Sequence, residues 1–205
     1  RIKFFGIGGA KIDPAAEIFM KDARFPYAVG YGLTETSPLL AGSGPSNTVP
    51  GTVGPVMQGI ELCILNPDPQ TGIGEVAARG DNVMKGYYKR QDLTDAVIDK
   101  DGWFDSGDLG FKTLDGELIL RGRKKDTIVL RSGENIEPVP IEMKLQESPF
   151  IAQAVVLGQD QRFLGALIVA DETEVKSYAA EQGILAASFE ELLTKPEIKK
   201  LFEQQ

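Results

Sequence analysis

The six residues Tyr31–Thr36 combine groups that could handle a nucleotide. The aromatic ring of Tyr31 could stack on a base, and Gly32 would let a ligand approach the backbone closely. The hydroxyl of Thr34 could donate to a phosphate, and the carboxylate of Glu35 is the hard oxygen ligand that Mg²⁺ prefers. The same residue types also make an ordinary polar turn, so this segment alone leaves both interpretations open.

A second candidate carboxylate, Asp108, lies in the segment Trp103–Gly110 and is preceded by Gly107. An ionised carboxylate can accept two hydrogen bonds at once from the diol of a ribose, and glycine lets a sugar come close. An aspartate that caps a turn would have the same local sequence. The segment is therefore more informative together with others than by itself.

Two further segments show the same ambiguity. The basic stretch Gly122–Asp126 could be functional or could be a solvated surface turn. The segment Ser132–Pro138 could be a tight turn before a helix, and Gly133 followed by Asn135 is its most specific feature.

The composition excludes several mechanisms and partners. The 205 residues include no His, which removes Ser/His/Asp triads, Cys/His pairs and His-ligated zinc, and the single Cys63 permits no disulfide within the chain, no four-Cys zinc site and no iron–sulfur cluster. A formal net charge of −8 without a broad basic stripe argues against nucleic acid as a partner. The longest clean apolar run, 167–170, is far below the ~20 residues of a membrane-spanning helix. We expect a cytoplasmic location with, at most, peripheral membrane contact.

The sequence contains no G-x-x-x-x-G-K-[ST] phosphate loop. The segment Gly72–Ala77 fits the dinucleotide pattern G-x-G-x-x-[GA], but it leads into a strand, whereas that fingerprint opens a helix. We interpret it as a turn.

The elements that must position these groups are strands and helices in alternation. We expect a buried strand over residues 2–7, a helix that begins at Asp13-Pro14, a strand over 27–31 and a loop over 41–55. The Tyr31–Thr36 segment then follows the C-terminal end of a strand, which is where open α/β sheets bind ligands.

The next part of the chain is predicted to be rich in β-strands. Turn residues separate expected strands at 61–65, 75–79, 109–113 and 117–120, with a short helix at 92–98. After the basic stretch the pattern predicts a strand at 127–130, a turn at 131–134, a helix at 139–147 and strands at 154–157 and 164–170. The last helices begin with expected capping boxes at Asp171…Glu174 and Ser188…Glu191.

The fold class is therefore mixed α/β, in two domains. Residues 1–123 would form the first, with an α/β part at 1–48 and a β-rich part at 49–123, and residues 124–205 would form most of the second. The charged stretch Gly122–Asp126 is the expected hinge. Because the chain opens on a strand-like run at Arg1 rather than on Met, we expect a piece of a longer polypeptide.

The order and spacing of these segments resemble the adenylate-forming superfamily, and most of all its long-chain fatty acyl-CoA synthetases. Five segments match the family's motifs in the family's order, and the resemblance extends over essentially the entire chain. The segments are Gly8–Ala10, Tyr31–Glu35, Gly86–Tyr88, Ser106–Asp108 and Gly122–Asp126 with the following Gly133–Ile136 and Pro138.

The resemblance implies a nucleotide site in the first domain. Tyr31 and Gly32 would contact adenine by stacking and close approach, and Gly9 and Ala10 would line the adenine site. Thr34 would then bind the α-phosphate.

The resemblance assigns the remaining charged and hinge positions as well. Glu35 would hold Mg²⁺, Asp108 would bind the ribose hydroxyls and Arg123 would add positive charge near ribose and phosphate. Lys125 would be the hinge about which the second domain reorients, and the loop around Gly133 would approach the acceptor thiol.

The implied activity is that of an ATP-dependent long-chain fatty acid:CoA ligase, with ATP/AMP, Mg²⁺ and coenzyme A as cofactors and a fatty acid as substrate. A carboxylate attacks the α-phosphorus of ATP to give an acyl-adenylate and pyrophosphate, and a thiol then displaces AMP. This chemistry relies on positioning and charge neutralisation and needs no imidazole. The alternatives are an adenylating enzyme that loads a carrier-protein thiol, and a non-catalytic nucleotide-binding module.

Two parts of the family pattern have no match in the chain: the Ser/Thr/Gly/Lys-rich phosphate loop upstream of Tyr31, and the adenylation lysine near the C-terminus. Lys195, Lys199 and Lys200 lie in a helical pattern without the expected glycine partner, so none receives that role. Since electrostatic donors in comparable sites contribute ~2.7–4 kcal/mol each, we expect this polypeptide by itself to be inactive or nearly so.

Overall fold

The computed structural model describes residues 2–204 and divides the chain into two compact units. The first unit ends at Lys125 and the second begins at Asp126. This division lies two residues beyond the boundary expected between 123 and 124.

The first unit opens with a small three-stranded sheet, ordered β1-β2-β3, and one helix. Strand β1 (Phe5–Ile7) pairs parallel with β2 (Tyr27–Gly32), and helix α1 (Pro14–Asp22) connects the two strands. Strand β3 (Leu39–Gly42) pairs antiparallel with β2. The expected start of α1 is confirmed, because the Asp13 carboxylate accepts a hydrogen bond from the Ala16 N–H at 2.7 Å. Strand β3 lies partly inside the segment expected to be a loop.

The prediction of a buried strand at residues 2–7 was wrong in both extent and burial. Strand β1 covers only Phe5–Ile7, and the side chains of Phe4 and Phe5 are 63% and 47% exposed. The apolar run is there, but β1 lies at the edge of the sheet and, among the described residues, pairs with β2 alone. The apolar composition therefore predicted that a strand forms here, but it did not predict how far the side chains of that strand are exposed.

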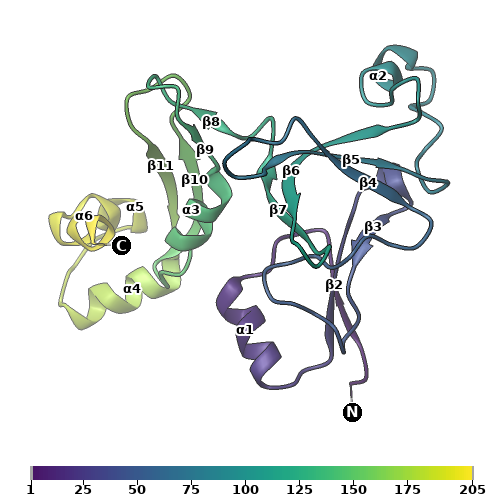
Figure 1. Ribbon diagram of the computed structural model, residues 1–205. Coiled ribbons are helices and arrows are strands. Elements are labelled where there is room, and N and C mark those ends of the chain that lie inside the picture. The colour runs from purple at the N-terminus through teal and green to yellow at the C-terminus, as the bar shows by residue number, and fades with distance from the viewer. Residues whose placement is uncertain (1, 205) are drawn as a thin grey trace. The chain divides into compact units, whose positions relative to one another are not determined.

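The β-rich part of the first unit is a four-stranded antiparallel sheet, ordered β4-β5-β6-β7 (Figure 1). Its strands are β4 (Glu61–Leu65), β5 (Gly74–Arg79), β6 (Phe104–Lys112) and β7 (Leu118–Arg123), and the short helix α2 (Gln91–Asp95) follows β5. This agrees with the expected hairpins. Two expectations need correction: β6 begins at Phe104 rather than 109, and Gly122 and Arg123 belong to β7 rather than to a hinge.

The two sheets of the first unit share one apolar core. Its buried residues come from both sheets and include Tyr31, Leu40, Val76 and Leu118. Tyr31 is thus both a core residue and a candidate for ligand contact.

In its described residues, 126–204, the second unit contains a short hairpin, a two-stranded sheet and four helices. Strands β8 (Ile128–Val129) and β9 (Asn135–Ile136) pair with each other, and helix α3 (Pro138–Leu145) lies against β10 (Ile151–Leu157), which pairs with β11 (Gly165–Ala170) (Figure 1). Helices α4 (Glu172–Glu181), α5 (Phe189–Thr194) and α6 (Pro196–Glu203) form a second core. The mixed α/β class is confirmed.

The expected capping residues of the last helices are confirmed as N-caps. The Asp171 carboxylate accepts from the N–H groups of Thr173 and Glu174, and the Ser188 hydroxyl accepts from the N–H of Glu191. The return bond of a capping box differs from expectation at both sites. The Asp171 N–H donates to the Phe150 carbonyl rather than to Glu174, and the Glu191 carboxylate accepts from Ala187 rather than from Ser188.

Within residues 2–204, no helix combines the length and the apolar character that crossing a bilayer would require.

Candidate nucleotide-binding site

Asp108 lies on a bulge in the middle of strand β6. The single residue Val76 of β5 lies opposite the three residues Ser106–Asp108, because Glu75 pairs with Leu109 and Ala77 with Asp105. The Ser106 hydroxyl donates to the Val76 carbonyl at 2.7 Å and accepts from the Asp108 N–H at 3.1 Å, and Gly107 takes a φ of +71°. Bulges bend a strand and re-aim its side chains, and glycine adopts positive φ without strain. The expected alternative of a turn-capping aspartate is therefore wrong.

Both oxygens of the Asp108 carboxylate have a protein partner. The Tyr31 hydroxyl donates to Oδ2 at 2.6 Å, and Arg123 Nε donates to Oδ1 at 2.9 Å. Arg123 faces Asp108 across the β6–β7 ladder as its register partner. The structure thus unites three predicted site residues that are far apart in sequence, with Asp108 at the centre.

Tyr31 is the buried member of this trio, with 7% of its surface exposed. Burial, followed by the negative charge of Asp108 and the hydrogen bond to it, raises the pKa of the Tyr31 hydroxyl far above its ordinary value. The hydroxyl therefore stays protonated and donates. Its anchoring of Asp108 is visible, whereas stacking of its ring on adenine stays a prediction.

The turn that carries Thr34 and Glu35 is made possible by Gly32. A Cβ at residue 32 would lie 1.7 Å from the Pro38 carbonyl oxygen, and the Leu33 N–H donates to that same oxygen at 3.0 Å. The chain doubles back here as the 3₁₀ turn η1 (Thr34–Thr36). Gly32 thus permits close backbone approach, although the approaching group is the chain itself. Thr34 is exposed on the turn and Glu35 is half-buried.

Glu35 is fixed by a region that the sequence analysis did not connect with it. The Tyr87 hydroxyl donates to Glu35 Oε1 at 2.9 Å, and the Met84 N–H donates to the Glu35 carbonyl at 2.7 Å. Among residues 2–204, no hydrogen-bond partner is found for the other carboxylate oxygen, Oε2. The only sequence signal for Tyr87 was its place in the Gly86–Tyr88 motif, which gave no role.

Glu35 fits the implied Mg²⁺ as a single hard oxygen ligand. Nowhere in residues 2–204 do three or more His, Cys, Asp or Glu side chains form a group that could hold a metal ion. Mg²⁺ in nucleotide sites is commonly held by one or two carboxylates together with substrate phosphates. The donor set is compatible with a metal that arrives with the nucleotide.

Gly9 and Ala10 lie on the exposed loop between β1 and α1. Gly9 has a φ of +80°, and a Cβ on its neighbour Gly8 would lie 3.4 Å from the Gly30 carbonyl oxygen. The loop therefore passes beside β2 immediately before Tyr31. Contact with adenine stays a prediction.

Lys125 is the exposed last residue of the first unit. The residue before it, Lys124, is fastened to this unit twice: its N–H donates to the Gly107 carbonyl at 2.9 Å, and its Nζ lies 2.7 Å from Glu75 Oε2. Glu75 was not singled out from the sequence. The attachment of the chain up to Lys124 is consistent with a hinge at Lys125, which stays a prediction.

Gly133 lies in the second unit, on the turn between β8 and β9, with a φ of +86°. The expected turn is present, and Asn135 starts a strand that was not predicted. Since the two units are not placed relative to each other, Gly133 is not assigned to the Asp108 site.

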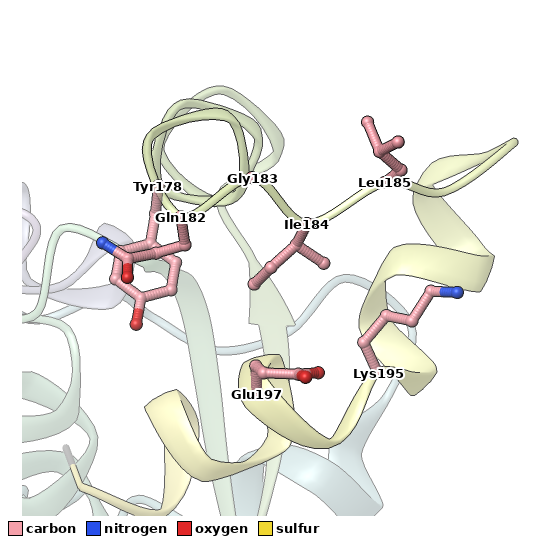
Figure 2. A pocket seen from close by; sticks show the side chains of 7 residues that line it. All are labelled: Tyr178, Gln182, Gly183, Ile184, Leu185, Lys195 and Glu197. Carbon is pink, nitrogen blue, oxygen red and sulfur yellow. The ribbon is translucent and has the colours of Figure 1, made fainter.

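A hollow of about 420 Å³ lies elsewhere, within the second unit. Figure 2 shows Tyr178 and Gln182 on one side of it and Lys195 and Glu197 on another. None of its lining residues was predicted to bind nucleotide.

Comparison with known proteins identifies the family to which the chain belongs. The AMP-binding enzyme family matches residues 1–88, and the AMP-binding enzyme C-terminal domain matches residues 125–198. The chain belongs to the adenylate-forming superfamily. Within it, several relatives are named ligases of long-chain fatty acids, as the motif order had indicated.

Two relatives illustrate the range of acceptor thiols in their names. The chain is 42% identical to the Long-chain-fatty-acid--[acyl-carrier-protein] ligase AEE15, chloroplastic, of Arabidopsis thaliana, over 82% of this chain and 25% of that protein. It is 36% identical to the Long-chain-fatty-acid--CoA ligase FadD15 of Mycobacterium tuberculosis, over 93% of this chain and 31% of that protein. The chain thus spans less than a third of the length of these relatives.

Solved structures of adenylate-forming enzymes share the fold. The o-succinylbenzoate CoA synthetase (MenE) of Bacillus subtilis in complex with the acyl-adenylate intermediate OSB-AMP has a TM-score of 0.74 and 27% identity, over 91% of this chain and 40% of that one. The same enzyme in complex with ATP and magnesium ion has a TM-score of 0.72 at 27% identity, over 90% of this chain and 40% of that one.

Proposed function

We propose that this chain carries the ribose-binding and acceptor-side parts of an ATP-dependent long-chain fatty acid ligase. The observation that carries the proposal is the Tyr31–Asp108–Arg123 cluster, in which a nearly buried carboxylate is held from both sides. Because Tyr31 and Arg123 fix both oxygens of the Asp108 carboxylate, the lone pairs that remain on these oxygens point in a fixed direction.

Asp108 retains room for a ribose diol. A carboxylate offers about four lone-pair positions, and Tyr31 and Arg123 use about two of them. The side chain of Asp108 is 12% exposed, so solvent still reaches it, while that of Arg123 is 57% exposed. Arg123 pairs with Asp108 and adds positive charge beside the proposed nucleotide.

The proposed reaction has two half-reactions. The fatty acid carboxylate attacks the α-phosphorus of ATP, which forms the acyl-adenylate and releases pyrophosphate; the sulfur of an acceptor thiol then attacks the acyl carbonyl and releases AMP. Asp108 would orient the ribose, Thr34 would donate to the α-phosphate, and Arg123 would offset developing negative charge. Bound at Glu35, Mg²⁺ would neutralise phosphate charge.

We propose coenzyme A as the acceptor and the cytoplasm as the location, with the Gly133 loop near the thiol. A carrier-protein thiol is the second candidate, because the relative that is 42% identical to this chain is named an acyl-carrier-protein ligase. Supplying the chain with a synthetic long-chain acyl-adenylate and either free coenzyme A or acyl-carrier protein discriminates the two. AMP release that requires coenzyme A supports the first, and release only with carrier protein replaces it by the second.

Calorimetric titration of the chain with AMP tests the proposed site. We expect binding that Asp108→Asn weakens about tenfold to a hundredfold, since a hydrogen bond to a charged group contributes roughly 1.5–3 kcal/mol. The matched control is Asp115→Asn, an exposed aspartate in the β6–β7 turn. Equal affinity of Asp108→Asn and the parent chain would refute the assignment.

A further proposal is that the chain by itself turns over little ATP, because the upstream phosphate loop and the C-terminal lysine of the family pattern have no match in it. Exchange of labelled pyrophosphate into ATP should be suppressed by several orders of magnitude relative to a complete family member. Rapid exchange by the chain would disprove this.

A further inference from the structure

One segment, Asn82–Tyr87, holds the turn that carries Glu35. The Asn82 side-chain amide donates to the carbonyls of Thr36 at 2.7 Å and Leu39 at 3.1 Å. The Met84 N–H and the Tyr87 hydroxyl add bonds to the carbonyl and the carboxylate of Glu35. The main chain and the side chain of Glu35 are therefore fastened by the same stretch of residues.

Tyr87 is itself held in place from helix α2. Its N–H donates to the Thr94 hydroxyl at 2.9 Å, and that hydroxyl donates to the Arg90 carbonyl at 3.1 Å. Gly86 lies so close to Thr94 that a Cβ would approach Thr94 Cγ2 to 2.7 Å, and its φ is +142°. Thr94 is only 8% exposed, so the residue that accepts the hydrogen bond from the Tyr87 N–H lies in the interior of the first unit.

The Tyr87 hydroxyl acts as the donor to Glu35. A protonated phenol has one hydrogen to give, and Glu35 Oε1 receives it at 2.9 Å. One carboxylate oxygen is thereby fixed while the other remains available.

We propose that Tyr87 is a positioning residue that fixes the Glu35 carboxylate so that Oε2 faces the Mg²⁺ of a bound magnesium–ATP complex. This inference rests on the proposed function. A glutamate has several rotatable bonds, and a metal ligand that must first be ordered binds more weakly than one already held. Tyr87 would thus act through Glu35 and not on the nucleotide itself.

The test compares Tyr87→Phe with Tyr88→Phe in the 205-residue chain. Each variant removes one phenolic hydroxyl, and Tyr88 is a matched neighbour whose side chain is 85% exposed. Affinity for ATP is titrated calorimetrically over a series of Mg²⁺ concentrations, and affinity for AMP is measured with magnesium chelated. Urea unfolding of each variant records the effect on stability.

We expect Tyr87→Phe to weaken magnesium–ATP binding about tenfold, the equivalent of one hydrogen bond to a charged group, and to shift the Mg²⁺ dependence to higher concentration. AMP affinity should stay unchanged, and Tyr88→Phe should behave as the parent chain. A parental Mg²⁺ dependence in Tyr87→Phe would overturn the proposal, as would an equal loss of AMP affinity, which indicates a merely structural role. A parent chain that binds neither nucleotide would overturn the proposed function and this inference with it, and is distinguished by failing without any substitution.

Discussion

The two candidate carboxylates of the first unit are held in contrasting ways. Asp108 lies on a strand in the middle of a sheet, its side chain is 12% exposed, and both of its oxygens have partners. Glu35 lies on a short 3₁₀ turn, half-buried, with one oxygen bonded to Tyr87. Asp108 is thus part of the sheet that forms the unit, whereas Glu35 lies on a turn and is held there by hydrogen bonds from another segment.

This contrast separates two kinds of functional residue. The partners of Asp108 belong to the same core and ladder that stabilise the unit, since Tyr31 is a core residue and Arg123 is a register partner. Its removal should therefore affect folding and binding together. The contacts of Glu35 come from a single segment, Met84–Tyr87, rather than from the core or a strand ladder, so its removal should affect binding with little effect on folding.

The largest expected effect comes from Gly32, which joins the two regions by following Tyr31 and preceding the turn. In Gly32→Ala the new methyl would lie 1.7 Å from the Pro38 carbonyl oxygen, so the chain reversal must open. We expect a loss of roughly 3 kcal/mol in the free energy of unfolding of the first unit, together with loss of AMP binding. Urea denaturation followed by fluorescence of the single Trp103 measures it.

The control for Gly32→Ala is Gly42→Ala on the paired strand β3. A Cβ there would lie 3.6 Å from its nearest neighbours, an ordinary contact distance. If both variants unfold at the same urea concentration, the close approach at Gly32 is not what fixes the turn.

The next effect is that of Asp108→Asn on stability. The amide cannot accept from both Tyr31 and Arg123 as the carboxylate does, and the Tyr31 hydroxyl is left in a buried position. We expect a loss of about 2 kcal/mol in unfolding free energy, moderated by the exposure of Arg123. Asp115→Asn in the exposed turn should change it by less than about 0.5 kcal/mol. If Asp108→Asn is as stable as the parent chain, Asp108 contributes to binding without stabilising the unit, as is expected for Glu35.

A smaller effect isolates the Tyr31 hydroxyl. Tyr31→Phe should lower the unfolding free energy by about 1 kcal/mol at neutral pH. Because the pKa of Tyr31 is raised on folding, its contribution is fully present below the unfolded-state pKa of about 10 and declines as the pH rises above that value. The stability gap between the parent chain and Tyr31→Phe should therefore narrow at alkaline pH. Tyr88→Phe, which lacks only an exposed hydroxyl, should run parallel to the parent at every pH.

The contrast between the two regions also marks what the sequence could predict. Strand β4 matched its expected range, and Asp13 caps α1, because alternation and capping are local properties. The bulge at Ser106–Asp108 was missed because it depends on pairing with Val76, which lies on another strand. The contact between Tyr87 and Glu35 was missed for the same reason: it exists only once the segment after β5 meets the turn after β2. Motif order therefore located the candidate residues, while the groups that orient them required the tertiary structure.

The smallest effect on stability is expected for Glu35→Gln. This variant is the sharpest test of the difference between Asp108 and Glu35. The glutamine oxygen can still accept from the Tyr87 hydroxyl, and the main-chain bond from Met84 is unaffected, so the unfolding free energy should stay within about 0.5 kcal/mol of the parent. Magnesium–ATP binding should nevertheless weaken, because the charge that would face Mg²⁺ is gone, while AMP affinity measured without magnesium should persist. Glu61→Gln, which removes the charge of an exposed ion pair with Arg79, serves as the control for general electrostatics. If Glu35→Gln destabilises the unit as much as Asp108→Asn does, Glu35 belongs to the scaffold and the distinction between the two carboxylates fails.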